Sequence, residues 1–176
     1  MALKLLPAAV DDAPALAELQ TAAAEHLTRL HGVGPWSTRT SEKGVLFAMR
    51  NSRVFLARED REILATVRLT TKKPWAIDPD YFTPCKNPLY LVGITVAPAH
   101  QRQGIGRGCL REALRIAQAW PADALRLDAY DAPAGAGPFY ARNGFNEVGR
   151  VTYLLCPLIY YELLAAQFPR AVQLGS

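Results

Sequence analysis

The sequence has only three cysteines, and no pair of them has the C-x-x-C spacing. Cys85, Cys109 and Cys156 are far apart and odd in number, which argues against a disulfide framework and against a zinc site. Cys109 lies on the apolar face of a predicted helix, so we interpret it as a packing residue rather than a nucleophile. We therefore expect no metal and no cysteine-based chemistry.

The chain also lacks a long apolar segment and a dense block of basic residues. The apolar stretch 154–164 is interrupted by Pro157 and Glu162 and is too short to span a bilayer. The apolar N-terminus ends at Asp11, too early for a signal peptide, so the expected location is cytoplasmic. The formal net charge is +4, and its basic residues are spread along the chain. We therefore expect neither nucleic-acid binding nor membrane binding.

A chain of 176 residues is long enough for one domain with a full hydrophobic core, and we expect a single domain over 1–176. Apolar spacing predicts a helix that is capped by Asp11 or Asp12 and reaches Leu30. Further helices are predicted at 41–50, from 105 to the Trp-Pro pair at 120–121, and at 134–143. Strands are predicted at 3–6, 53–57, 63–71, 88–96, 124–130, 145–153 and 158–164, and the tail 165–176 has little pattern.

The most informative stretch runs from Leu89 to Leu114 and reads as a buried strand, a short turn, a glycine-rich loop and the start of an amphipathic helix. Free backbone N–H groups converge at such a helix N-terminus, and the helix dipole adds positive potential. Glycines allow a diphosphate to approach the backbone closely, and arginines add charge at the rim. The candidate anion site consists of Gln101, Arg102, Gln103, Gly104, Ile105, Gly106 and Arg107.

Two common phosphate-binding motifs do not fit this loop. A Walker A loop requires Gly-Lys-Ser/Thr, whereas Arg107 and Gly108 follow Gly106 here. A dinucleotide fingerprint requires G-x-G-x-x-G, and this loop reads G-x-G-x-G. The alternative to a phosphate-binding loop is a glycine turn that only connects the strand to the helix.

The pattern Q/R-x-x-G-x-G/A directly after a strand resembles motif A of the GCN5-related N-acetyltransferase (GNAT) family. In that family the loop binds the pyrophosphate of acetyl-CoA. The resemblance implies an α/β (mixed α+β) fold with a central mixed, splayed β-sheet of about six to seven strands flanked by helices on both faces. It also implies a bulged central strand, which suits Gly93, and backbone contacts to the pantetheine arm at Ile94, Thr95 and Val96.

The stretch from Phe139 to Phe145 resembles motif B of the same family. Gly144 would close a helix in the left-handed conformation, and Phe145 would open the next strand. The resemblance implies that Tyr140 is the general acid that protonates the departing thiolate. A phenol has an ordinary pKa of about 10, so at neutral pH it holds a proton to donate. The alternative is that Tyr140 only packs against the cofactor.

Two positions depart from the family pattern. Pro133 occupies the place where many relatives have an Asn, and Asp131 is a candidate replacement as a helix cap or cofactor contact. The general base is open, because the central strand at 89–96 contains no acid. Asp128 on the neighbouring strand is the first candidate and His100 the second, although Asp128 could equally be a solvated strand residue.

The resemblance thus predicts an N-acetyltransferase that moves an acetyl group from acetyl-CoA to a primary amine, in a ternary complex and by direct attack. The expected acceptor is a small molecule, and a homodimer is possible by analogy with relatives. The loop 72–87 could form a wall of the acceptor site or could be an ordinary packed excursion. A non-catalytic acyl-CoA binding module and a longer acyl donor remain as alternatives. Residues that could line an acceptor pocket are Trp36, Arg68, Trp75, Tyr81, Phe82, Tyr160 and Tyr161.

Overall fold

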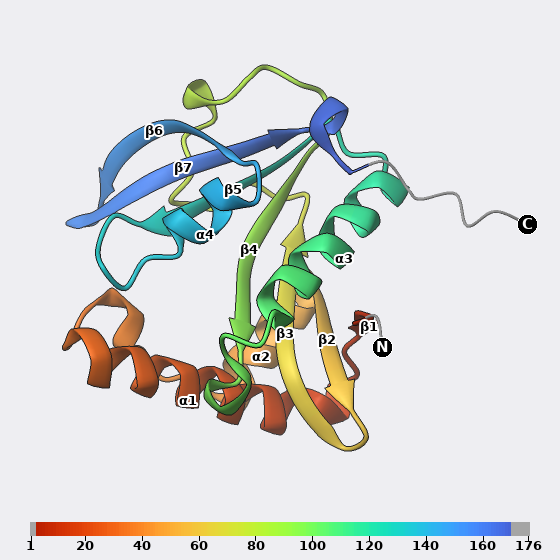
Figure 1. Cartoon of the computed structure of the whole chain (residues 1–176), viewed down its shortest axis with the longest axis vertical. Coiled ribbons are helices and arrows are strands. Elements are labelled where there is room, and N and C mark those ends of the chain that lie inside the picture. Colours follow the sequence, from red (N-terminus) through yellow and green to blue (C-terminus); the bar gives the residue numbers. More distant parts are fainter. Residues whose placement is uncertain (1–2, 170–176) are drawn as a thin grey trace, which may run out of the picture.

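The computed structural model describes residues 3–169, which form one twisted sheet in the strand order β1-β2-β3-β4-β5-β7-β6 (Figure 1). Within these residues β4 and β5 run parallel, and the other neighbouring pairs run antiparallel. β7 lies between β5 and β6, so the second strand of the last hairpin pairs with β5 and its first strand forms the edge of the sheet. The strands are β1 (Leu6–Pro7), β2 (Arg53–Glu59), β3 (Glu62–Thr70), β4 (Pro88–Val96), β5 (Ala124–Tyr130), β6 (Asn146–Tyr153) and β7 (Cys156–Leu164).

Helices cover both faces of the sheet. α1 (Ala13–His31) and α2 (Glu42–Asn51) pack on one face, where Val54 and Leu56 point from β2. α3 (Ile105–Ala119) and α4 (Gly137–Arg142) lie on the other face, seen in front of the sheet in Figure 1. Phe55 and Ala57 of β2 join that second core, as the two-residue period of a strand requires. The mixed, helix-flanked sheet predicted from the sequence is confirmed.

Helix ends follow local chemistry in most places. The Ser41 hydroxyl accepts the Gly44 N–H at 3.1 Å and caps α2, and Gly144 at φ +90° follows the end of α4. Asp12 precedes α1 but does not cap it, because its carboxylate accepts the Ala9 N–H at 2.8 Å. The five 3-10 turns of residues 3–169 are η1 (Val10–Asp12), η2 (Pro35–Ser37), η3 (Pro79–Tyr81), η4 (Pro98–His100) and η5 (Ala165–Gln167).

Three predicted segments differ in the structure. The first strand covers Leu6–Pro7 instead of 3–6, because only these two residues pair with β2. α4 starts at Gly137 instead of 134, because Gly135 lies in a tight turn where a Cβ atom would approach the Tyr130 carbonyl oxygen to 1.8 Å. The tail contributes to the main core through Phe168, which is 6% exposed. Residues 170–176 of the tail lie outside the described part of the chain.

The loop between β3 and β4 packs against the sheet. Ile77 and Phe82 are buried against Tyr90 and Tyr160. The Tyr160 hydroxyl accepts the Asp78 N–H at 3.1 Å and donates to the Ala76 carbonyl, which fixes the loop to β7. Ile77 and Phe82 therefore anchor the loop, whereas Trp75 and Tyr81 are exposed.

A buried ion pair adds a second attachment for the same loop. The Arg126 Nε donates to Glu162 at 2.9 Å, and both side chains are almost fully buried. The other Glu162 oxygen accepts the Thr83 N–H at 3.1 Å, while Arg126 also donates to the Thr83 carbonyl. Strands β5 and β7 thus share one charge network with the loop.

We expect Glu162→Gln to lower the free energy of unfolding by about 3–5 kcal/mol, because it leaves the buried Arg126 charge without a counter-charge. Urea denaturation measures the loss. The double variant Arg126→Met/Glu162→Met removes both charges and should recover most of it. A loss below about 1 kcal/mol in the single variant would show that the pair is unimportant for stability.

Candidate active site

The parallel strands β4 and β5 part in the middle of the sheet. They pair only from Pro88 to Tyr90 on β4, opposite residues 124–126 of β5. Beyond that point β4 continues to Val96 without a partner on this side, and Figure 1 shows the two strands diverging. The register between β3 and β4 shifts at the same place, so that Val92 is an extra, bulged residue. The predicted bulge and splay are confirmed.

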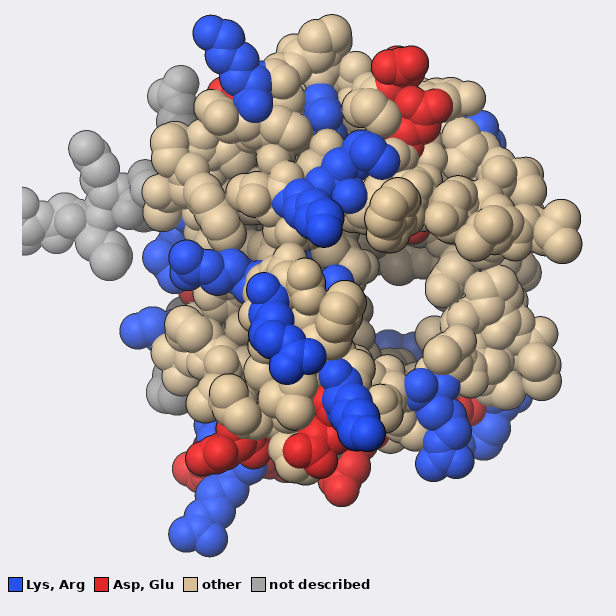
Figure 2. Space-filling view, turned by 180° about the vertical axis from the view of Figure 1, so that it is seen from behind, with Lys and Arg blue, Asp and Glu red and all other residues tan. Residues whose placement is uncertain are grey.

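A ring of elements surrounds the gap between β4 and β5. α1 packs against β4 at one end, and η2 follows α1 through a short link. Trp36 of η2 contacts Tyr130 at the end of β5 edge to face, with ring centroids 5.8 Å apart. Figure 2 shows the molecule from behind, and an opening passes through it at this place. The gap can therefore be reached from both faces of the sheet.

Beyond Tyr90, the backbone amides of β4 that face the gap have no partner strand. The Ala97 N–H donates to the Leu64 carbonyl at 2.9 Å, on the β3 side. Because strand residues alternate, the amide of Thr95 also points toward β3, whereas those of Ile94 and Val96 point into the gap. The amides of Ile94 and Val96 therefore face the gap, and the amide of Thr95 faces β3.

The predicted anion loop forms a cradle at the N-terminus of α3. Arg102 and Gly104 adopt left-handed conformations, with φ of +60° and +83°. Among residues 3–169, no backbone or side-chain acceptor bonds the amides of 103–107. Gln101 and Gln103 fold back instead, and their Nε2 atoms donate to the Val96 and Ala99 carbonyls at 3.2 and 3.1 Å.

This cradle fits a diphosphate group. The free N–H groups converge at a helix N-terminus, and no atom lies within 4 Å of the place where a Gly104 side chain would begin. The loop also lines a groove of about 600 Å³, and the charged residues in its wall are Lys4, Arg58, Glu59, Asp60 and Arg111. A Cβ atom at Gly106 would lie 3.7 Å from Val96 and 3.8 Å from Phe139, which are ordinary van der Waals contacts, so these two side chains form the base of the loop.

Tyr140 lies on the α4 side of the sheet. Its ring is 6% exposed and packs edge to face on Phe139 and Phe145. The hydroxyl bonds no described residue, and every fully buried polar side-chain atom among residues 3–169 has a partner. The hydroxyl must therefore reach accessible space. Burial, and next the charge of Asp128, raise the pKa of Tyr140, so the hydroxyl keeps its proton at neutral pH.

Asp128 lies on the opposite face of the sheet from Tyr140. Its neighbours Leu127 and Ala129 point into the core that holds Tyr140, so Asp128 points to the α1 and α2 side, next to Tyr160. Its carboxylate makes no ion pair with the described residues. Burial raises the pKa of Asp128, which makes this carboxylate a better proton acceptor than an exposed aspartate.

Other predicted site residues lie elsewhere. His100 is paired with Glu62 at 2.7 Å, outside the gap. The prediction that Asp131 caps a helix is wrong, because the N-cap of α4 is Ala136 and the Asp131 carboxylate pairs with Arg150 at 3.0 Å. The aromatic residues predicted to line an acceptor pocket do not lie together. Phe82 and Tyr160 are in one core and Tyr161 is in the other. Trp75 is 86% exposed and Tyr81 is 44% exposed.

The sequence profile of the acetyltransferase (GNAT) family matches residues 15–145. The chain belongs to the GNAT family. GNAT acetyltransferases use acetyl-CoA. The profile ends at Phe145, the last residue of motif B, and thus includes both predicted motifs.

Solved structures share this GNAT fold at low sequence identity. The ribosomal-protein-S18-alanine N-acetyltransferase of Escherichia coli is 19% identical, with a TM-score of 0.68 and 99% of each chain covered. A putative acetyltransferase of Salmonella typhimurium, solved with its cofactor acetyl-CoA, is 16% identical, with a TM-score of 0.67 and 94% of this chain and 95% of that chain covered. A GNAT acetyltransferase of Elizabethkingia anophelis with acetyl-CoA bound is 16% identical, with a TM-score of 0.62 and coverage of 93% and 98%.

Sequence reasoning missed Tyr130, which closes the ring around the gap against Trp36. No local pattern marks it, because its role depends on a contact between segments nearly a hundred residues apart in the chain. Within residues 3–169 no cluster of His, Cys, Asp and Glu side chains is arranged to hold a metal ion. None of the helices in that range has the length and apolar character needed to cross a membrane.

Proposed function

We propose that this GNAT protein transfers an acetyl group from acetyl-CoA to the primary amine of a small molecule, by direct attack within a ternary complex. One observation carries the proposal: the gap opens to both faces of the sheet, with the Tyr140 hydroxyl on the α4 side and the Asp128 carboxylate on the α1 and α2 side. In this proposal Tyr140 is the proton donor and Asp128 is the proton acceptor.

Each element of the site then has one task. The amides of the α3 N-terminus and Gly104 hold the pyrophosphate, and the backbone of Ile94 and Val96 orients the pantetheine arm. Acetyl-CoA supplies an activated thioester to this arrangement. Asp128 accepts a proton from the incoming ammonium group, because only about one amine in a thousand is neutral at pH 7. Tyr140 gives its proton to the departing thiolate.

The cysteines support direct transfer over a covalent acyl-enzyme. Cys109 is fully buried, and burial raises the pKa of its thiol to about 11. Burial also raises the pKa of Cys85 and of Cys156. At neutral pH all three thiols are therefore protonated and weakly nucleophilic.

Initial-rate kinetics test the ternary complex. With both substrates varied, we expect intersecting double-reciprocal plots and no release of free thiol when acetyl-CoA is present without an amine. Parallel plots, or one equivalent of thiol released per enzyme without an amine, would contradict direct transfer.

We expect Asp128→Asn to lower kcat/KM by about 100-fold or more, because the amine loses its proton acceptor. The wild-type rate should fall on acidification through a pKa above the usual aspartate value of about 3.9, and this acidic limb should be absent in the variant. Asp80→Asn, which removes an exposed carboxylate on η3, serves as the control. Equal pH–rate profiles for the wild type and Asp128→Asn would remove the base role.

The same variant has an expected effect on stability. The pKa of Asp128 is raised in the folded state, so its carboxylate destabilises the fold above that pKa and has no such effect below the ordinary value. Asp128→Asn should therefore keep or raise Tm at neutral pH. A lower Tm at neutral pH would indicate a structural role instead.

A further inference from the structure

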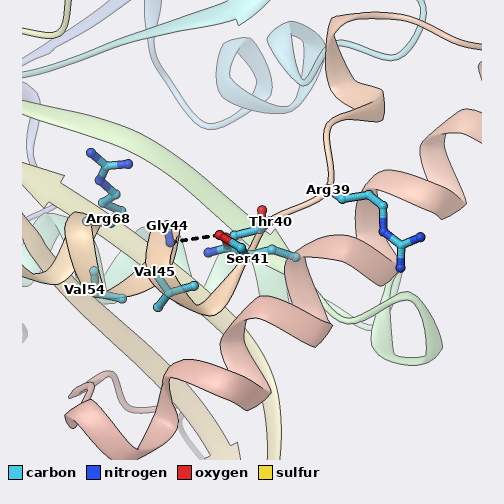
Figure 3. A pocket seen from close by; sticks show the side chains of 9 residues that line it. Arg39, Thr40, Ser41, Gly44, Val45, Val54 and Arg68 are labelled. Atoms are coloured by element: carbon cyan, nitrogen blue, oxygen red, sulfur yellow. Dashed lines mark hydrogen bonds between the residues drawn. The ribbon is translucent and has the colours of Figure 1, made fainter.

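A cavity of about 300 Å³ lies between α1, α2 and the strands β2 and β3. The cavity is on the same face of the sheet as Asp128, and Figure 3 shows its lining side chains. Most of its polar lining is neutral, from Gln20, Thr40 and Ser41. Two arginines lie at its opposite ends in Figure 3, Arg39 and Arg68.

The two arginines differ in their partners. Arg39 is largely exposed and lies 3.7 Å from the Glu25 carboxylate. Arg68 is partly buried, and no carboxylate of residues 3–169 lies within ion-pair distance of it. Its Nε atom donates to the Ser52 hydroxyl at 2.8 Å, while its two terminal amino groups bond no described residue. The fork of the guanidinium is thus held in place but left free to bind.

An unpaired, partly buried cation is costly for a protein. Burial lowers the pKa of Arg68, which reflects the loss of water around its charge. In contrast, Arg126, which is almost fully buried, is neutralised by Glu162. A charge of this kind without a partner in the protein is explained most simply by a partner in a ligand.

Arg68 also lies beside the gap. It faces Gly93 across the β3–β4 pair, at the bulge where β4 has left β5. A Cβ atom at Gly93 would have no heavy atom within 4 Å, so open space continues from Arg68 over β4 toward the gap. The reacting position between β4 and β5 is therefore about two strand spacings, roughly 10 Å, from the Arg68 backbone.

The surface charge on this face favours an anion. Figure 2 views the molecule from the α2 side. Lys and Arg side chains form a band beside the opening, whereas Asp and Glu side chains gather at the lower edge and in a second group at the upper right. Such a band attracts negatively charged molecules and repels polyamines.

We propose that the acceptor is a small primary amine that also carries a carboxylate or phosphate, and that Arg68 binds this anionic group while the amine reaches the gap. The assignment rests on the proposed acetyl transfer. Arg68 would act as a specificity residue, because its bidentate fork recognises an oxyanion and a neutral amine leaves it unpaired. The acceptors used in the test separate the amine from the anion by two to four methylene groups.

The test compares matched acceptors at saturating acetyl-CoA. β-Alanine, γ-aminobutyrate and δ-aminovalerate are assayed beside their uncharged amides, and phosphoethanolamine is assayed beside ethanolamine. We expect kcat/KM for at least one anionic member to exceed that for its neutral partner by tenfold or more, and the carboxylate and phosphate pairs show which anion is preferred. Arg68→Met should remove this preference by slowing the anionic member while leaving the neutral one unchanged.

Two further variants separate recognition from folding. Arg68→Lys keeps the charge without the fork and should retain only part of the preference. Arg61→Met removes one charge at the exposed β2–β3 turn, about seven residues before Arg68 in the chain. This variant should retain the full preference for the anionic acceptor. Tm should not fall in Arg68→Met, because the cation it removes is unpaired.

The outcomes distinguish this inference from the proposed function. Transfer to neutral and anionic amines at equal rates, or a preference that survives Arg68→Met, would overturn the assignment of Arg68 while acetyl transfer stands. If no amine is acetylated, acetyl transfer to small amines fails, and calorimetric titration of the enzyme–CoA complex with γ-aminobutyrate then decides the anion site. Binding that is lost in Arg68→Met supports it, and absence of binding overturns it.

Discussion

Replacing Tyr140 by Phe is expected to lower kcat by about 100- to 1,000-fold and to leave the Kd for acetyl-CoA within about twofold of the wild type. The change removes one oxygen atom from a ring that is otherwise packed on Phe139 and Phe145. Because that oxygen bonds no described residue, its loss should not disturb the fold. A proton donor, in contrast, is needed only when the thiolate leaves, so the effect belongs in kcat.

Tyr153→Phe provides the control, because Tyr153 lies on the outer strand β6, opposite Cys156, and has no role in the proposed reaction. We expect its kcat to equal that of the wild type. The proton-donor role also predicts that an acyl donor with a more acidic thiol is less affected by Tyr140→Phe, since its thiolate needs less protonation to leave. An unchanged kcat in Tyr140→Phe would limit Tyr140 to packing.

Replacing Gly104 by Val is expected to weaken acetyl-CoA binding by about 100-fold or more. Gly104 has a φ of +83°, a conformation that a β-branched residue adopts only with strain. The loop must then change its path, and the amides of the α3 N-terminus no longer converge on the pyrophosphate. Calorimetric titration with acetyl-CoA measures the loss.

Gly32→Val is a control for backbone strain outside the loop, at a glycine whose positive φ is combined with a ψ of 179°. Gly32 has a φ of +80°, no atom lies within 4 Å of its missing side chain, and it follows α1 rather than preceding α3. Both variants should lose stability by about 1–2 kcal/mol, but only Gly104→Val should lose acetyl-CoA affinity. Full affinity in a folded Gly104→Val protein would show that the loop is a connecting turn.

The parts of the fold that sequence could predict have local causes. The anion loop depends on residues that follow one another between a strand and a helix, so its order alone indicates its shape. Gly144 closes α4 in the left-handed form because few other residues adopt it easily. Cys109 was predicted to be packed by its place on an apolar helix face, and it is fully buried.

The parts that sequence could not predict depend on distant contacts. Asp131 pairs with Arg150 across the sheet instead of capping a helix. The Arg126–Glu162 network joins β5, β7 and the loop before β4, and nothing near either residue indicates the partner. Tyr140 and Asp128 lie on opposite faces of the sheet because Asp128 is on the face of β5 that points away from the Tyr140 core. The two-residue period of a strand assigns a residue to a face only when the register of the strand is known.

The central claim is that acetyl transfer to an amine takes place in the gap between β4 and β5. Its most direct test is mass spectrometry of reactions that contain the enzyme, acetyl-CoA and the panel of small amines, with free thiol measured in parallel. The account predicts one acetylated amine for each thiol released, and loss of both products in Asp128→Asn. Tight binding of acetyl-CoA with no acetylated amine from any member of the panel would contradict it and would favour a protein that only binds the cofactor.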